Sequence, residues 1–327
     1  MLNEISVEII RKCPNNCLHC SSISNCKREE IMPISKFKEI VNDAKALGAK
    51  VICLSGGEPF IHPDIIDMIK YVYENNLESY VYTSGIAFDK HGNYSSIPLS
   101  ILDEISSYVT KLIFNIEAGT EETYNRIMGT KGCYKKMQQS IIAANERNIL
   151  TEAHFVPMKL NLYEIDKVIE LCCNYGVSKL SFLRLVVHGR AKENENVIAL
   201  SNEENIILKN KLEEIENNTE ISIRIGVPLS DGDSCKKCEA ANGKLNIRYD
   251  GFVFPCEVFK NYHFKYSMPN LIADNVYSSN LIDIYKNSAY LKCVREISHN
   301  HTKSGCVEPC IGQKLINIEI ENLEELK

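Results

Sequence analysis

The chain alternates between short apolar strand patterns and amphipathic helix patterns from residue 4 to residue 185. A strand pattern covers residues 4–10, and a helix pattern starts at Pro33 and closes at Gly48. Further strand patterns lie at 51–54, 79–82, 111–116, 152–156 and 179–185, and further helix patterns at 65–73, 100–107, 134–147 and 162–175. Strands that alternate with helices pair in parallel, because each helix carries the chain back across the sheet. Six strand–helix units are too few to close an eight-stranded barrel, so the pattern predicts an α/β fold built as an open, partial (β/α)6 TIM barrel.

The functional residues of such a barrel lie at the carboxyl ends of its strands. Gly-Gly, Thr-Ser-Gly and Asn-Ile-Glu segments follow the second, third and fourth strand patterns, and Arg184 lies at the end of the sixth. Residues 86–97 are interpreted as a loop insertion. We therefore expect the active site at this end of the barrel.

The character of the sequence changes after residue 225. A helix pattern at 202–217 is followed by a turn-rich linker at 230–234, and beyond it come short segments, glycine turns and clustered cysteines. A core of that size rarely supports itself alone. We predict a barrel domain at 1–225 and a small domain at 226–327 that bound metal stabilises.

Composition narrows the classes of function. The formal net charge is −6 with no basic block, so nothing favours a nucleic-acid backbone as partner. The sequence shows no signal peptide, and no stretch approaches the ~18 consecutive apolar residues of a membrane helix. We therefore expect a cytoplasmic protein that binds neither nucleic acid nor membrane. In a long chain of this kind, fourteen cysteines favour metal binding over disulfides.

Three of the cysteines directly follow the first strand pattern. Cys13, Cys17 and Cys20 lie within eight residues, a spacing that can wrap one cuboidal iron–sulfur cluster. A [4Fe–4S] cluster has four irons, so three thiolates leave one iron open to bind a cofactor or substrate. The alternatives are a structural zinc site with a distant fourth ligand and a group of reduced thiols, although zinc usually takes paired C-x2-C halves.

The sequence Ser55-Gly56-Gly57-Glu58-Pro59 closes the second strand pattern. Glycines let the backbone approach a ligand closely, and Glu58 can accept a charge-assisted hydrogen bond from an ammonium group. The C-x3-C-x2-C spacing followed by this GGEP motif resembles the radical SAM superfamily. The resemblance covers roughly residues 4–190 and implies that the open iron chelates S-adenosylmethionine (SAM). Reductive cleavage of SAM then yields a 5′-deoxyadenosyl radical, which removes a hydrogen atom from the substrate.

The resemblance also implies contacts to SAM. His19 is expected near the adenine, Asn115 and Glu117 near the ribose, and Arg126 near the carboxylate. For the less specific of these positions, the alternative is a polar side chain that faces solvent. The segment from Phe182 to Ala191 resembles a segment of peptide-modifying relatives. The alternative for that segment is an ordinary strand and turn. The predicted SAM-binding residues are His19, Gly56, Gly57, Glu58, Ser84, Asn115, Glu117, Arg126 and Arg184.

A second group of cysteines lies in the last third of the chain. Asp250-Gly251 between two apolar runs predicts a β-hairpin, which would bring Cys238 and Cys256 together. With Cys306 and Cys310 they would saturate one auxiliary [4Fe–4S] cluster. The spacing resembles the auxiliary domain of the SPASM and twitch radical SAM subfamilies, and the small number of cysteines favours the single-cluster, twitch-like form.

Other cysteines leave this assignment open. Cys235 forms a C-x2-C with Cys238 and could displace one ligand, Cys293 lies alone in a helix-like stretch, and a zinc site is the alternative to the cluster. The scattered thiols are interpreted as buried or incidental: Cys26, Cys53, Cys133, Cys172 and Cys173.

Three functions are compatible with these motifs. The first hypothesis, which the resemblance favours, is an oxidoreductase that modifies a ribosomally synthesised peptide by a thioether or carbon–carbon cross-link or by epimerisation. The second is a radical SAM dehydrogenase of a small molecule, with the auxiliary cluster as electron acceptor. The third is a non-enzymatic iron–sulfur scaffold. The GGEP motif disfavours it, because a scaffold needs no SAM site.

We expect a flavodoxin- or ferredoxin-type electron donor as a partner. The first strand pattern begins at about residue 4, so any leader recognition is expected to need a separate protein or the C-terminal tail.

Overall fold

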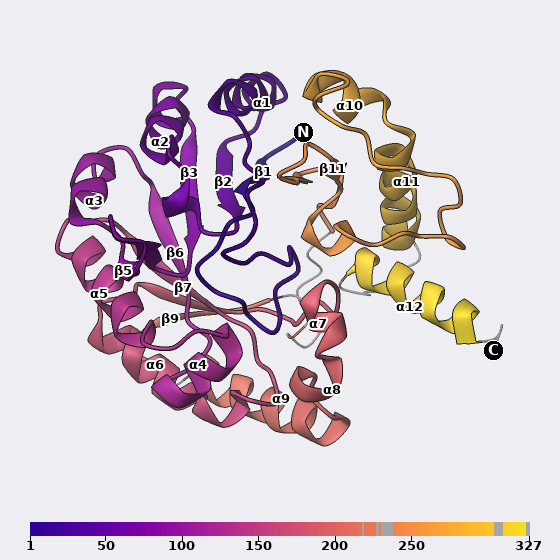
Figure 1. Cartoon of the computed structure of the whole chain (residues 1–327). Helices are drawn as coiled ribbons and strands as arrows, with labels where there is room; N and C mark the ends of the chain where they lie inside the picture. The colour runs from indigo at the N-terminus through magenta and orange to yellow at the C-terminus, as the bar shows by residue number, and fades with distance from the viewer. Residues whose placement is uncertain (218, 227–228, 230–237, 304–309, 325–327) are drawn as a thin grey trace.

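The computed structural model describes residues 1–217, 219–226, 229, 238–303 and 310–324. Seven parallel strands form a curved sheet, with helices on its outer side (Figure 1). Their order follows the chain: β1 (Glu4–Ile10), β2 (Val51–Gly56), β3 (Glu78–Thr83), β6 (Lys111–Asn115), β7 (Thr151–Phe155), β8 (Lys179–Phe182) and β9 (Ser222–Ile225). The predicted open partial barrel is confirmed, and β9 extends it by a strand too short for its pattern to be recognised.

The helices that cover the sheet bury the apolar faces that the sequence pattern predicts. In α1 the buried residues are Phe37, Ile40, Val41 and Ala44, a spacing that places them on one helix face. The outer helices are α1 (Ile34–Ala46), α2 (Ile65–Glu74), α3 (Leu99–Ile105), α4 (Glu121–Met128), α5 (Tyr134–Asn145), α6 (Ile165–Asn174) and α9 (Asn202–Asn217). None of the described helices is long and apolar enough to cross a membrane.

The two faces of β1 differ in polarity. Ile5, Val7 and Ile9 are fully buried in the core beneath the helices. Because successive side chains of a strand point to opposite faces, Glu4, Ser6 and Glu8 face the inside of the barrel. The interior therefore carries polar groups.

One local expectation was wrong, and one helix was missed. Residues 86–97 contain a small hairpin, β4 (Ile86–Phe88) and β5 (Tyr94–Ser96), where a loop was expected. Its turn is held by the Asp89 side chain, which accepts from the backbone N–H groups of His91 and Asn93. The short helix α4 was missed, although Thr120 caps its start and Gly129 ends it in the left-handed conformation.

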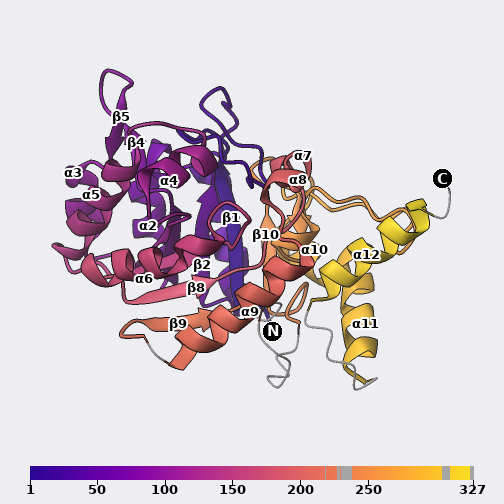
Figure 2. The same cartoon turned by 90° about the horizontal axis from the view of Figure 1, so that it is seen from below.

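The C-terminal region continues the same sheet. β10 (Lys244–Ile247) pairs in parallel with β1, and β11 (Val253–Phe254) pairs with β10 as the expected antiparallel hairpin. Beyond them lie α10 (Leu281–Asn287), α11 (Ala289–Lys303) and α12 (Ile311–Glu324), on the side of the molecule away from α3 and α5 (Figure 2). The domain boundary at 225/226 stays a prediction, and the nine-stranded sheet runs across it. The predicted linker at 230–234 lies outside the described residues.

Candidate functional site

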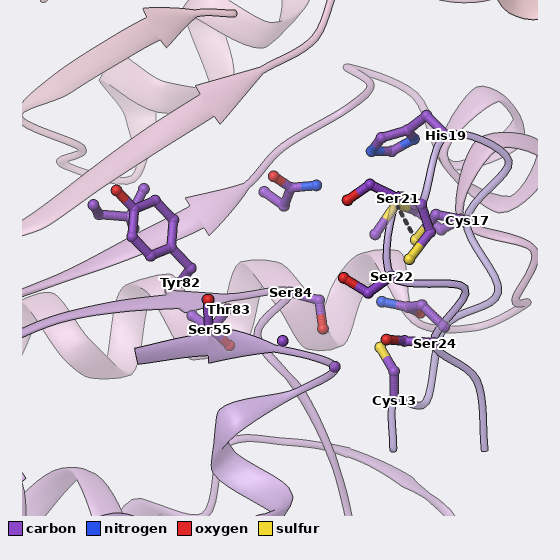
Figure 3. A pocket seen from close by; sticks show the side chains of 17 residues that line it. Cys13, Cys17, His19, Ser21, Ser22, Ser24, Ser55, Tyr82, Thr83 and Ser84 are labelled. Carbon is purple, nitrogen blue, oxygen red and sulfur yellow. Dashed lines mark hydrogen bonds between the residues drawn. The ribbon is translucent and has the colours of Figure 1, made fainter. Parts of the chain in front are cut away.

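The three cysteines after β1 lie on one loop at the carboxyl end of the strands. Cys13 is buried, and Cys17 and Cys20 are half-buried. All three line a pocket of about 230 Å³ that extends into the barrel past Ser84 and Tyr82 (Figure 3). The three cysteines predicted as cluster ligands and the carboxyl ends of the strands therefore line the same pocket.

The cysteine loop is bound on one side by the end of α4. The backbone N–H groups of Asn16 and Leu18 donate to the carbonyls of Met128 and Ile127, both at 2.9 Å. These carbonyls belong to the last turn of the helix, where no intrahelical donor remains. A Cβ at Gly129 would lie 2.7 Å from the Asn16 carbonyl oxygen, so only glycine allows this approach. The missed helix is therefore a support of the site.

The segment after β8 binds the loop from another side. The Arg190 guanidinium donates to the carbonyl oxygens of Cys17 and Ser24, both at 2.8 Å. The Arg190 backbone N–H donates to the carbonyl of Cys20 at 3.1 Å. Arg190 begins the short helix α7 (Arg190–Glu193), and one of its guanidinium nitrogens, Nη1, is buried without a partner among the described residues.

The glycine pair after β2 packs against the chain that leads into Cys13. The Gly57 N–H donates to the Ile10 carbonyl at 2.6 Å, and the Glu58 N–H to the Lys12 carbonyl at 2.9 Å. A Cβ at Gly57 would lie 2.0 Å from the Lys12 carbonyl oxygen. Both glycines also line the pocket. They are therefore needed for backbone packing in addition to the predicted approach to a ligand.

Glu58 is fully buried behind the pocket wall. Its carboxylate accepts from the Thr83 hydroxyl at 2.7 Å, and from the Ser84 hydroxyl at 2.6 Å and backbone N–H at 2.8 Å. Burial raises the pKa of Glu58, whereas the hydrogen bonds from Ser84 and Thr83 oppose that rise. Ser84 lines the pocket, and Glu58 does not. Ser84 thus stands between Glu58 and the cavity.

A second buried carboxylate orients two pocket residues. Glu117 Oε1 lies 3.3 Å from His19 Nε2 and accepts a hydrogen bond from the Asn115 amide at 3.0 Å. His19 and Asn115 line the pocket, while Glu117 is fully buried behind them. The other ring nitrogen of His19, Nδ1, is buried with no partner in the described part of the chain.

The remaining predicted SAM contacts lie elsewhere. Arg126 is exposed in the last turn of α4. Arg184 reaches the C-terminal region, where its guanidinium donates to Cys310 and Gln313. The roles assigned to both residues stay predictions.

The predicted SAM contacts and cluster ligands leave out several residues that line the pocket. Some are inward-facing positions near strand ends, which the predicted register could have identified. These lining residues are Asn15, Ser21, Ser22, Ser24, Ser55, Tyr82, Thr83, Ile113 and Met128.

A protonated thiol is a poor metal ligand. Burial raises the pKa of Cys13 and Cys17, and the neighbouring Cys20 raises that of Cys17 further, while Arg190 lowers it. Metal binding requires the thiolate, which a bound cluster itself stabilises. Three thiols that line one pocket fit a three-thiolate cluster with an open position, and nearby nitrogens of His19 and Arg190 have no partner among the described residues.

A second thiol group is assembled from distant elements. Cys238 precedes β10, Cys256 follows β11 and Cys310 precedes α12. Burial raises the pKa of Cys238, and Cys310 adds to that rise; the pKa of Cys256 is raised by burial, by Glu257 and by both other thiols. The three thiols are therefore neighbours.

The other predicted cysteines are placed as follows. Cys235 and Cys306 lie outside the described residues. Cys293 is half-buried on α11, Cys53, Cys133 and Cys172 are buried, and Cys26 and Cys173 are exposed. Where the chain is described, no three Cys, His, Asp or Glu side chains meet closely enough to hold a single metal ion.

A buried polar cluster joins the cysteine loop to the C-terminal region. Lys260, next to the short helix η3 (Glu257–Phe259), forms an ion pair with Glu8 of β1 and donates to the Ser22 hydroxyl at 2.8 Å. Ser22 in turn donates to Glu8 at 2.7 Å. Burial, together with the charge of Lys260, lowers the pKa of neighbouring His188 to about 4. This polar junction, Glu8–Ser22–Lys260, was not foreseen.

Two family models match the chain. Residues 7–172 match the radical SAM superfamily, and residues 235–312 match SPASM, an iron–sulfur cluster-binding domain. The first match covers half of the chain and includes both sequence motifs of the pocket.

Curated relatives and solved structures agree with these matches. PqqA peptide cyclase of Ruegeria pomeroyi is 25% identical over 297 residues, which span 89% of this chain and 76% of that protein. AdoMet-dependent heme synthase of Methanosarcina barkeri is 24% identical over 196 residues, 59% of this chain and 53% of that protein.

The solved structures show the shared fold. SuiB of Streptococcus suis bound to precursor peptide SuiA has a TM-score of 0.72 at 15% identity, covering 90% of this chain and 67% of that chain. The structure of anSMEcpe with bound AdoMet has a TM-score of 0.67 at 14% identity, covering 91% of this chain and 84% of that chain.

Proposed function

Because this chain belongs to the radical SAM superfamily and carries a SPASM iron–sulfur domain, we propose that this radical SAM enzyme modifies a ribosomally synthesised peptide. The modification is a thioether or carbon–carbon cross-link or an epimerisation. The observation that carries the proposal is the similarity to PqqA peptide cyclase, which extends through both the barrel and the C-terminal region. The fold shared with SuiB, which has been solved with a precursor peptide, supports it further.

Cys13, Cys17 and Cys20 would hold the catalytic [4Fe–4S] cluster. Their position in one pocket supports this assignment, because a shared space would let three thiolates bind one cluster and leave one iron without a protein ligand. When bound, the cluster and SAM together supply the 5′-deoxyadenosyl radical that removes a substrate hydrogen atom. A flavodoxin- or ferredoxin-type protein would provide the electron.

The protein's own side chains would position SAM from the pocket wall. Ser84 donates its hydroxyl proton to Glu58, so the lone pairs of its oxygen stay available for the SAM ammonium. Glu58 would act through Ser84 in this arrangement. Glu117 would hold His19 and Asn115 in orientations that suit the adenosine. Gly56 and Gly57 would let the backbone approach the cofactor.

The second thiol group would hold an auxiliary [4Fe–4S] cluster. Cys238, Cys256 and Cys310 would be three ligands and Cys306 the fourth, with Cys235 as the competing candidate. Cys310 adds to the raised pKa values of Cys238 and Cys256, and this proximity supports a common ligand. Four thiolates would complete the coordination of this cluster.

The test is anaerobic co-expression with the short open reading frame beside this gene, in D2O, followed by mass analysis of the peptide. Loss of two hydrogens indicates cross-linking, and uptake of one deuterium indicates epimerisation. Co-expression with a Cys17→Ala variant is the control and should leave the peptide unchanged. An unchanged peptide mass with the wild-type enzyme contradicts the proposal and favours dehydrogenation of a small molecule.

A further inference from the structure

The segment that follows β8 contacts both thiol groups. At one end, Arg190 donates to backbone carbonyls of the cysteine loop. At the other end, Arg184 donates to the Cys310 sulfur itself, with 3.3 Å between Nη2 and Sγ. The two arginines therefore differ in kind: Arg190 holds a backbone, and Arg184 touches a proposed cluster ligand.

Arg184 keeps its charge available for this ligand. Its second contact is the neutral side-chain oxygen of Gln313, in the first turn of α12. Among the described residues, no carboxylate forms an ion pair with its guanidinium. A guanidinium is protonated at every pH that the protein experiences. Cys310 thus receives a donor that carries a full positive charge.

Hydrogen bonds to the sulfurs of an iron–sulfur cluster, and nearby charge, set its reduction potential. The reduced cluster is more negative than the oxidised one, so a positive donor stabilises the reduced form more. We propose that Arg184 raises the reduction potential of the auxiliary cluster that Cys310 binds. This inference rests on the proposed auxiliary cluster, and it assigns Arg184 to that cluster in place of SAM. A raised potential suits a cluster that takes up an electron.

The experiment is a redox titration of the reconstituted, full-length enzyme, followed by electron paramagnetic resonance. Addition of SAM identifies the signal of the first cluster, because only that signal responds. In Arg184→Gln the ratio of oxidised to reduced auxiliary cluster at a fixed potential should rise about tenfold, which corresponds to about 59 mV for a one-electron couple. The potential of the first cluster should stay unchanged.

Two further variants complete the test. Arg224→Gln on β9 removes the same charge from a guanidinium that acts on His154 in the barrel, and it should leave the auxiliary potential unchanged. Arg184→Lys keeps the charge and loses the planar donor, so it should shift the potential in the same direction by a smaller amount. If Arg184→Gln fails to retain its iron, Arg184→Lys decides the question.

A wild-type potential in Arg184→Gln, or in Arg184→Lys where the glutamine variant loses its iron, overturns the proposal. An equal shift of both clusters also overturns it, because it indicates a general effect of charge. The titration uses no substrate, so a failed peptide assay leaves its result intact. Absence of any second cluster signal in the wild-type enzyme instead contradicts the proposed auxiliary cluster.

Discussion

Each thiol group is contacted by an arginine, but the two arginines contact different atoms. The cysteine loop at 13–20 is fixed through its backbone, by carbonyl and amide contacts from α4, the glycine pair and Arg190. In the second group the Arg184 guanidinium donates to the sulfur of Cys310 itself. Backbone support leaves the first three thiols facing an open pocket, as a cluster with a free iron needs. A charged donor at a sulfur acts on the ligand itself, which is one way in which a protein sets the reduction potential of a cluster.

The largest expected effect comes from removing one thiol of each group. Cys17→Ser should lose about four irons and all SAM cleavage, because two thiolates cannot hold the first cluster. Cys256→Ser should lose the auxiliary irons and keep SAM cleavage. Iron analysis and chromatography of 5′-deoxyadenosine check both variants. If either variant loses all iron, the two groups are not independent.

The next effect concerns the polar junction between the regions. Lys260→Ala leaves Glu8 as an unpaired charge in a buried site, which should destabilise the protein by about 3–5 kcal/mol. The double variant Glu8→Leu with Lys260→Met should recover most of this loss, because it removes both charges. Urea unfolding measures the difference. Equal stability of the single variant and wild type contradicts the buried ion pair.

A smaller effect is expected at the wall of the pocket where we propose that SAM binds. Glu58→Gln replaces a carboxylate that accepts from Thr83 and Ser84, and charged hydrogen bonds of this kind are worth about 1.5–3 kcal/mol. SAM binding should weaken by roughly tenfold or more, while iron content stays at the wild-type value. Equilibrium binding of SAM gives the affinity. An unchanged SAM affinity removes Glu58 from the proposed binding site.

The smallest effect is a pH dependence at His188. Its pKa in the folded protein is lowered to about 4, below the ordinary value of 6.5. Between these values the unfolded chain binds more protons, so the stability contributed by neutral His188 is present above about pH 6.5 and is lost as pH falls toward 4. His188→Asn should lack this loss. Unfolding at several pH values from 5 to 8 compares the two proteins, and parallel pH curves would contradict the prediction.

The parts of the site that are close in sequence could be predicted, and the parts that are distant could not. Three cysteines within eight residues, and a glycine pair that ends a strand, are local patterns whose chemistry requires no tertiary information. The strand–helix alternation similarly predicts the barrel, because each outer helix carries an apolar stripe on the face that packs against the sheet. The roles assigned to individual residues await the experiments above.

Long-range partners account for what was missed. Arg184 and Cys310 are separated by 126 residues, and Lys260 and Glu8 by 252, so neither pair leaves a pattern in the sequence. The helix α4 has eight residues, too few for a clear apolar period, yet its last carbonyls bind the cysteine loop. β9 and β10 have four residues each, and their place in the sheet follows from pairing with strands already formed.

The pairing of β10 with β1 has a consequence for biosynthesis. β1 emerges from the ribosome first, but its neighbour on one side is β10, at residues 244–247. At about 5–20 residues per second, this edge of β1 stays unpaired for tens of seconds. Unpaired strand edges promote association with other chains. The barrel is therefore completed late in synthesis, and a gene fragment that ends before β10 should yield an aggregation-prone product.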